Sequence, residues 1–397
     1  MKNFKKLSAL VLAGAMVFSL AACGGGNAET PAPETTTTPT ESGAPAETTP
    51  ATDMKVAMIT DYGDITDQSF NQTTYEACNE FCTANSVEFT YYKPAGDSTA
   101  ERVAMVDASV AEGYNVIVMP GYAFAETIKE TADMYPDVTF IALDVGEGDL
   151  GADYTVPSNV YCAVYQEELC GYMAGYAAVK LGYTHLGFLG GMAVPAVQRY
   201  GYGFIQGADA AAVELGNGAD VTVEYVYGNQ FFGDADITAY MDNWYQTQGV
   251  EVVFACGGGI YTSAAEAAAK VGGKVIGVDV DQAGIIDAYG EGMTVTSAMK
   301  GLANTTKHLL QETMDGNFAN YGGQIETLGL VSGDDPTANY VQLPMESTQW
   351  SDSFTQDNYK ALVAGMFDGT ITVSNDVSVA PADNATAITV NAYDNIK

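Results

Sequence analysis

The sequence predicts an α/β protein with two doubly wound lobes, and three observations support this fold class. From residue 55 onward, short β-rich runs alternate with amphipathic stretches at about the spacing of βαβ units. A second series of the same kind begins near residue 160. About 345 residues follow the N-terminal region, which is long for one hydrophobic core and natural for two.

The individual elements follow from the apolar pattern. In the first series the predicted strands are 55–60, 87–92, 115–119 and 138–143, and the predicted helices are 69–84, 98–112 and 124–134. Ser98 and Glu101 have capping-box spacing, which sets the start of the second helix. In the second series the predicted strands are 185–189, 221–226, 252–255, 274–278 and 294–296, with helices that include 196–215 and 261–271. Parallel strands joined by right-handed crossovers are expected in both.

Small, polar and aromatic residues follow these strands at their carboxyl ends. They include 61–63, 120–122, 144, 190–191, 228–229, 257–259, 279 and 297. Open α/β sheets bind ligands beyond the carboxyl ends of their strands, so the two edges are expected to form one cleft. Turn preference explains the glycines equally well, but it gives less reason for Asp144 and Asp279 to follow apolar strands.

The N-terminus is typical of a bacterial lipoprotein. Lys2, Lys5 and Lys6 precede an uncharged apolar run over 7–20, and the sequence Leu-Ala-Ala then leads to Cys23. This pattern predicts a signal peptide over residues 1–22 and lipidation of Cys23. The alternative is an ordinary signal peptide with a chance cysteine.

The segment after Cys23 is predicted to be a tether. Residues 24–52 are rich in Gly, Thr, Pro, Glu and Ala and contain no aromatic residue and no Leu, Ile or Val. Such a composition buries too little apolar surface to offset its ordering entropy, so residues 23–53 are expected to be the lipidated cysteine and a disordered linker. No later stretch is apolar enough to span a bilayer. The predicted location is the extracytoplasmic face of the cell membrane, through a lipid anchor.

Charge and reactive residues exclude several classes of function. The formal charge is −35, and it becomes −38 once the three lysines of the signal peptide are removed. Such a surface repels nucleic acid. The five cysteines after Cys23 are an odd number without zinc-site spacing, and with two histidines in the chain neither a metal site nor a cofactor is expected. Buried free thiols are the preferred interpretation.

Five stretches, in order, resemble the basic membrane protein family, whose members are purine-nucleoside-receptor lipoproteins of ABC importers. The residues that carry the resemblance are 61–72, 187–192 with 203–207, 275–282, 296–300 and 354–373. Each motif alone is weak, and the specificity lies in their order. The family fold is the type I periplasmic-binding-protein fold, in which two Rossmann-like lobes are joined by hinge strands.

The resemblance implies a domain organisation and a set of partners. Lobe 1 is expected to comprise residues 54–158 and 282–330, and lobe 2 residues 159–281 and 331–397. The expected function is capture of a nucleoside, preferably a purine, and its delivery to an ABC importer permease by a monomeric protein. No catalytic residue is expected.

The resemblance also implies the ligand site. Phe70 matches the aromatic ring of lobe 1, and Phe231 or Phe232 matches the ring of lobe 2. Asp61 and Asn71 match contacts to the base edge. On the ribose side the matching residues are Gly258, Asp279 and Lys300, and Asp144 joins the cleft as a strand-end carboxylate.

Structural interpretations of these residues stay open. Phe70 could be a core residue at a helix start, Asp279 a helix cap and Lys300 a solvated charge. Gln68 stands where the family often has Lys, and Asp64-Ile65 where it often has Gly-Gly, which puts the base preference in question.

Rival functions are a sugar or autoinducer receptor of the same fold, a secreted enzyme acting on nucleosides, and a surface antigen without a ligand. The sequence has no G-x-S-x-G, H-E-x-x-H or P-loop motif, which disfavours the enzyme.

Overall fold

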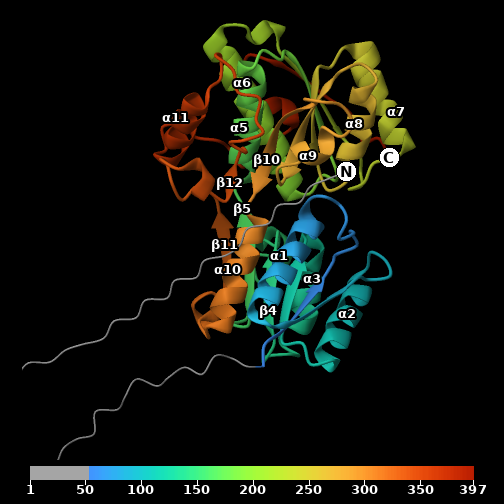
Figure 1. The fold of residues 1–397 in the computed structure, drawn as a ribbon, viewed down its shortest axis with the longest axis vertical. Coiled ribbons are helices and arrows are strands. Elements are labelled where there is room, and N and C mark those ends of the chain that lie inside the picture. The colour runs from blue at the N-terminus through green and yellow to red at the C-terminus, as the bar shows by residue number, and fades with distance from the viewer. Residues whose placement is uncertain (1–52) are drawn as a thin grey trace, which may run out of the picture. The chain divides into compact units, whose positions relative to one another are not determined.

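The computed structural model describes residues 53–397, so the predicted signal peptide, Cys23 and nearly all of the predicted linker lie outside the described residues. The described chain forms two largely parallel β-sheets, each covered by helices, which Figure 1 shows as two lobes. The predicted α/β class with two lobes is confirmed. Within the described part, no helix has both the length and the apolar character needed to cross a bilayer.

Lobe 1 is built on a six-stranded parallel sheet with the strand order β11-β5-β4-β3-β1-β2. The strands are β1 (Lys55–Ile59), β2 (Glu88–Tyr92), β3 (Val116–Pro120), β4 (Thr139–Leu143), β5 (Val160–Tyr165) and β11 (Gln324–Leu328). The helices are α1 (Phe70–Asn85), α2 (Thr99–Ala111), α3 (Ala125–Thr131), α4 (Glu147–Leu150) and α10 (Leu302–Met314). The central strands are buried along nearly their whole length, which explains their continuous apolar sequences.

Lobe 2 is built on a seven-stranded sheet with the order β12-β10-β9-β8-β6-β7-β13, parallel except for the pair β10–β12. Its strands are β6 (His185–Gly190), β7 (Thr222–Tyr227), β8 (Val252–Cys256), β9 (Lys274–Asp279), β10 (Thr294–Lys300), β12 (Val341–Gln342) and β13 (Thr389–Ala392). Its helices are α5 (Glu167–Lys180), α6 (Pro195–Leu215), α7 (Ala235–Asn243), α8 (Tyr261–Ala269), α9 (Ala283–Ile286) and α11 (Gln356–Phe367). The C-terminal strand β13 adds to the edge of this sheet beside β7.

The expected lobe boundaries were wrong at two strands. β5 lies in the sheet of lobe 1, where it pairs with β4, although residues 159–281 were expected in lobe 2. β10 lies in the sheet of lobe 2 beside β9, although residues 282–330 were expected in lobe 1. The physical reason is strand pairing: each of these strands adds to the sheet that the preceding strands have formed, and the chain crosses to the other lobe only after it.

The chain therefore crosses between the lobes after β5, after β10 and between β11 and β12. Backbone hydrogen bonds join the crossings: Gln166 N donates to Leu328 O at 2.9 Å, and Gly301 N donates to Tyr340 O at 2.7 Å. Tyr340 N in turn donates to Gly329 O at 3.0 Å. These bonds make the crossings a single hinge region, which Figure 1 shows where β5, β10, β11 and β12 meet.

Helices α5 and α6 pack with their backbones in contact, because glycines line the interface. A Cβ at Gly175 would collide with the carbonyl oxygen of Phe204, and one at Gly203 would collide with that of Glu168. The backbone carbonyls that face these glycines leave no room for a methyl group. The spacing Gly-x-x-x-Gly in each helix is therefore a packing requirement.

We expect Gly175→Ala to lower the free energy of unfolding by about 1–3 kcal/mol, because overpacking outweighs the roughly 1 kcal/mol that alanine gains in a helix. Gly284→Ala is the matched control, since a Cβ at this position in α9 meets no atom within 4 Å. Urea unfolding of both variants would test the packing. A Gly175→Ala protein as stable as the control would contradict it.

The five described cysteines, Cys78, Cys82, Cys162, Cys170 and Cys256, are all free and buried. The prediction of buried free thiols is confirmed. The described residues also contain no cluster of three or more side chains that could hold a metal ion.

Candidate functional site

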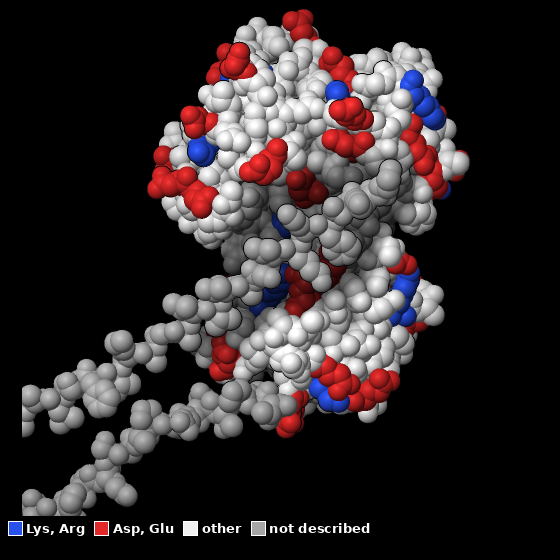
Figure 2. All heavy atoms as spheres, viewed as in Figure 1, with Lys and Arg blue, Asp and Glu red and all other residues white. Residues whose placement is uncertain are grey.

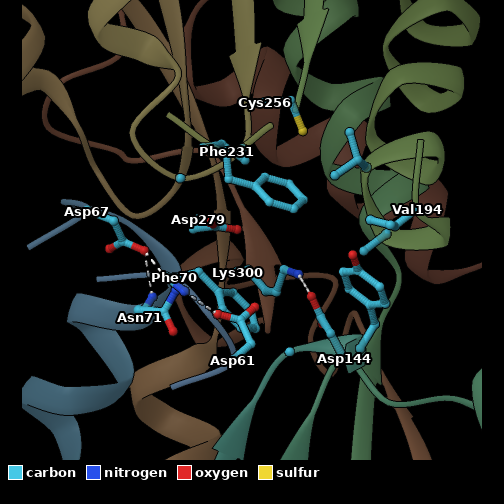
Figure 3. A pocket seen from close by; sticks show the side chains of 18 of the residues that line it. Asp61, Asp67, Phe70, Asn71, Asp144, Val194, Phe231, Cys256, Asp279 and Lys300 are labelled. Atoms are coloured by element: carbon cyan, nitrogen blue, oxygen red, sulfur yellow. Dashed lines mark hydrogen bonds and ion pairs between the residues drawn. The ribbon is translucent and has the colours of Figure 1, made fainter. Parts of the chain in front are cut away.

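The carboxyl ends of the strands in both lobes line one cavity of about 800 Å³. Lobe 1 contributes the segments that follow β1, β3 and β4, and lobe 2 contributes those that follow β6, β7 and β8 together with the last residues of β9 and β10. The cavity wall includes all nine residues that the sequence singled out, which are Asp61, Phe70, Asn71, Asp144, Phe231, Phe232, Gly258, Asp279 and Lys300. Figure 3 shows most of them converging from the two lobes.

Two aromatic rings enter the cavity from different lobes. Phe70 is the first residue of α1, and its half-buried ring faces the Lys300 ammonium, with Nζ 5.1 Å from the ring centroid. Phe231 is also half-buried and extends into the cavity from the loop after β7 (Figure 3). Phe232 lies at the rim with 61% of its surface exposed. Of the two candidates in lobe 2, Phe231 is therefore the ring that extends into the cavity.

Glycines make room for the Phe231 ring. A Cβ at Gly191 would collide with the ring, and one at Gly257 would lie 2.8 Å from its Cδ1. Gly258 has a φ of 49°, and a Cβ there would lie 2.8 Å from the carbonyl oxygen of Phe231. Gly258, which we expected beside a sugar, thus has a packing function in this loop as well as a place in the cavity wall.

The ammonium group of Lys300 lies at the centre of a buried ion network. Its Nζ is 2.7 Å from Asp144 Oδ2 and 3.0 Å from Glu167 Oε1, and its side chain is 2% exposed. Glu167 is fully buried, and its other oxygen lies 2.6 Å from Nε of Arg199. The rings of Phe70, Tyr165 and Tyr200 surround the ammonium at 5.1–5.6 Å. Lys300 is thus a paired, buried charge and not a solvated one.

The charged groups of this network shift one another's pKa values. Burial alone would lower the pKa of Lys300, but the neighbouring carboxylates of Asp144, Glu167 and Asp279 outweigh it and raise that pKa. Burial raises the pKa of Asp144 to about 6, although Lys300 opposes the shift. Lys300 therefore stays charged at physiological pH, whereas the raised pKa of Asp144 brings its protonation closer to the physiological range.

Asp144 and Asp279 share a strained backbone conformation. Both have positive φ, at 60° for Asp144, directly after β4, and at 65° for Asp279, the last residue of β9. Non-glycine residues in this region cost free energy and occur mainly where the surrounding structure fixes them, often at functional sites. The left-handed turn directs each carboxylate into the cavity.

Asp279 bridges the lobes. Its Oδ2 accepts a hydrogen bond of 2.6 Å from the Ser69 hydroxyl in lobe 1. Asp279 does not cap α9, whose N-cap is Gln282, so the helix-cap interpretation is wrong. Burial raises the pKa of the Asp279 carboxyl.

The expected base-edge residues are partly engaged by the protein. Asp61 Oδ1 accepts from the backbone N–H groups of Tyr62 and Gly63, at 2.6 and 2.7 Å. The Asn71 amide donates to Asp67 Oδ2 at 3.2 Å, and its own Oδ1 is buried without a partner among the described residues. Burial raises the pKa of the Asp61 carboxyl. Both side chains thus belong to the cavity wall and also stabilise the loop before α1.

Sequence reasoning did not single out three residues of the cavity wall, Tyr62, Asp67 and Arg199, nor Glu167, which lies behind the wall and pairs with Lys300. Glu167 and Glu168 open α5, and Arg199 lies in the first turns of α6. For Glu167, the available signal in the sequence was the pair of consecutive acidic residues at the start of an apolar helix. The Tyr62 ring lies 6.4 Å from that of Phe231, and its hydroxyl lies 3.4 Å from Met192 Sδ, so it also crosses the cleft.

We expect the protein to become less stable as the pH rises from about 5 to 8. Burial, reinforced by the charge of Glu167, raises the pKa of Glu168 to about 7, against 4.5 for the free side chain. When a group has a higher pKa in the folded protein than in the unfolded chain, it stabilises the folded state fully at any pH below its unfolded pKa. This stabilisation is lost as the pH rises through the folded pKa. Glu168 contributes up to about 3 kcal/mol of this change, and Asp144 acts in the same direction.

Replacing Glu168 with Gln should therefore flatten the pH dependence of the unfolding free energy, measured in urea at pH 5, 6.5 and 8. Glu130→Gln is the control, since Glu130 is exposed on α3. A Glu168→Gln protein with the pH slope of the wild type would refute the assignment.

Comparisons with known proteins agree with this architecture. A family model described as "ABC transporter substrate-binding protein PnrA-like" matches residues 54–335. The nucleoside-binding protein BmpA of an ABC transporter from Lactococcus lactis subsp. cremoris is 27% identical over 300 residues, which are 71% of this chain and 80% of the relative. Basic membrane protein B of Borreliella afzelii is 26% identical over 287 residues, 70% of this chain and 79% of the relative.

Solved structures give the same fold. A solute-binding protein of an ABC transporter from Conexibacter woesei has a TM-score of 0.62 at 22% identity, and the match covers 81% of this chain and 99% of that one. A solute-binding protein from Aeropyrum pernix has a TM-score of 0.61 at 22% identity, with coverage of 82% and 88%. The type I periplasmic-binding-protein fold is confirmed. The chain belongs to the basic membrane protein family of PnrA-like substrate-binding proteins of ABC transporters.

Proposed function

We propose that the protein is a lipid-anchored receptor that captures a nucleoside, preferably a purine, outside the cytoplasm and delivers it to an ABC importer. The observation that carries the ligand class is the meeting of two aromatic rings, Phe70 and Phe231, with Asp279 and Lys300 in one cavity between the lobes. Membership of a substrate-binding family supports the transport role, and one relative is named as nucleoside-binding.

The aromatic rings suit a flat heterocycle. A base that stacks on an aromatic ring gains about 1–3 kcal/mol, whichever base it is. A purine covers more of each ring than a pyrimidine and is therefore preferred. The tilted contact between Tyr62 and Phe231 supplies further aromatic surface at the same place.

The ion network suits an uncharged sugar. Asp144 Oδ1 is buried and has no partner among the described residues, so it is free to accept a hydrogen bond from a ribose hydroxyl. Hydrogen bonds to charged groups contribute roughly 1.5–3 kcal/mol. Asp279 and Lys300 lie in the same part of the cavity, where they can accept from and donate to a diol.

The same network disfavours a nucleotide. The charge of Lys300 is already matched by Asp144 and Glu167, while Asp61, Asp67 and Asp279 also line the cavity. One phosphate charge at 4 Å from an unmatched carboxylate costs about 4 kcal/mol at an effective dielectric constant near 20. Figure 2 shows acidic side chains over the outer surface of both lobes as well, which disfavours the approach of an anion.

Calorimetry with inosine, guanosine, adenosine, cytidine, their monophosphates and ribose would test the proposal. Purine nucleosides are expected to bind most tightly, and mass spectrometry of the ligand released from purified protein should identify one of them. Tighter binding of ribose alone would support the sugar receptor, and tighter binding of a monophosphate would refute the uncharged ligand. Release of free base from a nucleoside would indicate an enzyme.

Two further parts of the proposal concern the protein as a whole. Lipidation of Cys23, which lies outside the described residues, is to be tested by incorporation of a palmitate analogue, which a Cys23→Ala protein should lose. Closure of the lobes about the three crossings should reduce the radius of gyration in small-angle scattering when ligand is added. An unchanged radius at saturation would refute closure.

A further inference from the structure

Lys300 has a second ion-pair partner, Glu167, that does not itself line the cavity. Glu167 is the first residue of α5, directly after the first crossing from lobe 1 to lobe 2, and its side chain is fully buried. Lys300 is the last residue of β10, directly before the second crossing. The ion pair between Glu167 Oε1 and Lys300 Nζ, at 3.0 Å and without hydrogen-bond geometry, thus joins two of the three chain segments that form the hinge, while Lys300 donates its hydrogen bond to Asp144 Oδ2.

The other members of the network belong to one lobe each. Arg199, on α6 of lobe 2, holds the second Glu167 oxygen through Nε at 2.6 Å. Asp144 follows β4 of lobe 1 and holds Lys300 at 2.7 Å. Because Asp144 lies in lobe 1 and Lys300 ends a strand of lobe 2, their ion pair spans the cleft, whereas the pairs made by Glu167 lie on the lobe 2 side.

We propose that Glu167 is the positioning residue for ligand capture: it holds the Lys300 ammonium in the cavity from the hinge and leaves Asp144 free to engage the sugar. Arg199 fixes the Glu167 carboxylate on one side, so the carboxylate cannot follow Lys300 toward solvent. With Glu167 in place, Lys300 keeps one buried partner when the Asp144 contact is exchanged for a ligand hydroxyl. The charge of Lys300 therefore stays directed at the ligand.

The pairing of charges supports this role. Two cations, Lys300 and Arg199, make their ion pairs with two carboxylates, Asp144 and Glu167, and the buried carboxyl of Asp279 lies close enough to act on Lys300 as well. Without the Glu167 charge, Arg199 would lose its ion-pair partner, and Lys300 would keep only the one with Asp144 across the cleft. The neighbour Glu168 offers a contrast, because it is also buried but has no ion-pair partner and does not line the cavity.

The test rests on the proposed function and uses inosine and its free base hypoxanthine at pH 7. Glu167→Gln keeps the size of the side chain and removes its charge. We expect inosine binding to weaken tenfold or more and hypoxanthine binding less than threefold, because the sugar alone is expected to use Lys300. Glu168→Gln should leave both affinities within twofold of the wild type. Equal losses for inosine and hypoxanthine in Glu167→Gln would overturn the proposal.

A double-mutant cycle that combines Glu167→Gln with Lys300→Met separates an effect of Glu167 through Lys300 from a general effect on the stability of the protein. If Glu167 acts through Lys300, the Glu167→Gln change should alter inosine affinity less than twofold in the Lys300→Met background. A full tenfold loss in that background would refute the inference. If the wild type binds neither inosine nor hypoxanthine, the proposed function fails. The same four proteins are then compared by the midpoint of their unfolding in urea. Additive shifts of that midpoint would then overturn the Glu167–Lys300 coupling, and non-additive shifts would support it.

Discussion

Lys300→Met should lower the free energy of unfolding by about 3–5 kcal/mol at pH 7.5, because it leaves buried carboxylates without their counter-ion. The Lys300 ammonium contacts Asp144 and Glu167 and is itself 2% exposed. Methionine fills a similar volume, so lost packing contributes little. The whole effect is then the cost of unpaired negative charge.

This loss should become smaller at pH 5, where Asp144 takes up a proton. Its pKa is raised to about 6 even with Lys300 present, and it rises further once the ammonium is removed. Urea unfolding at the two pH values measures the difference. Lys307→Met is the control, since the pair between Lys307 and Glu80 is exposed and contributes at most about 1 kcal/mol. A loss for Lys300→Met that does not depend on pH would contradict the electrostatic explanation.

Phe231→Ala should weaken binding of every nucleoside by about 1–3 kcal/mol, whereas Phe232→Ala should change it by less than about 0.5 kcal/mol. The ring of Phe231 extends into the cavity beside Tyr62, and Phe232 is 61% exposed at the rim. Each is replaced by the same small side chain, so the two variants control for each other.

Calorimetry with inosine would measure both affinities, with circular dichroism as a check that each variant is folded. A larger loss for Phe232→Ala than for Phe231→Ala would mean that the wrong ring has been assigned. A similar loss for both would mean that the loop, and not one ring, forms the wall of the base site.

The sequence allowed the fold class to be predicted because the apolar pattern of buried parallel strands is local. The strand over 139–143 and the helix over 195–215 were expected within one or two residues of where they lie. The lobe to which a strand belongs, by contrast, depends on pairing with distant strands. Nothing in the residues of β5 or β10 states which neighbouring strand they pair with, so both were assigned to the wrong lobe.

The candidate site likewise could be predicted only where the signal is local in the sequence. Asp144, Asp279 and Lys300 could be named from their places at strand ends, because the carboxyl edge of a parallel sheet is where ligands bind. Glu167 and Arg199 could not, since their importance depends on a contact between the starts of two helices, α5 and α6. Likewise only the structure distinguishes Phe231 from Phe232, since the ring of Phe231 packs against Gly191 and Gly257 and that of Phe232 is exposed.

The interleaved path of the chain has a consequence for folding kinetics. β11 completes the first sheet beside β5, and Tyr161 and Glu326, 165 positions apart, form a hydrogen bond of 2.7 Å across this pair. Contacts of such sequence separation slow folding, because a long loop must close before the pairing stabilises it. Lobe 1 cannot be completed before most of lobe 2 has been synthesised. We expect an intermediate in refolding in which β1 to β4 are protected from hydrogen exchange before β5 and β11 are.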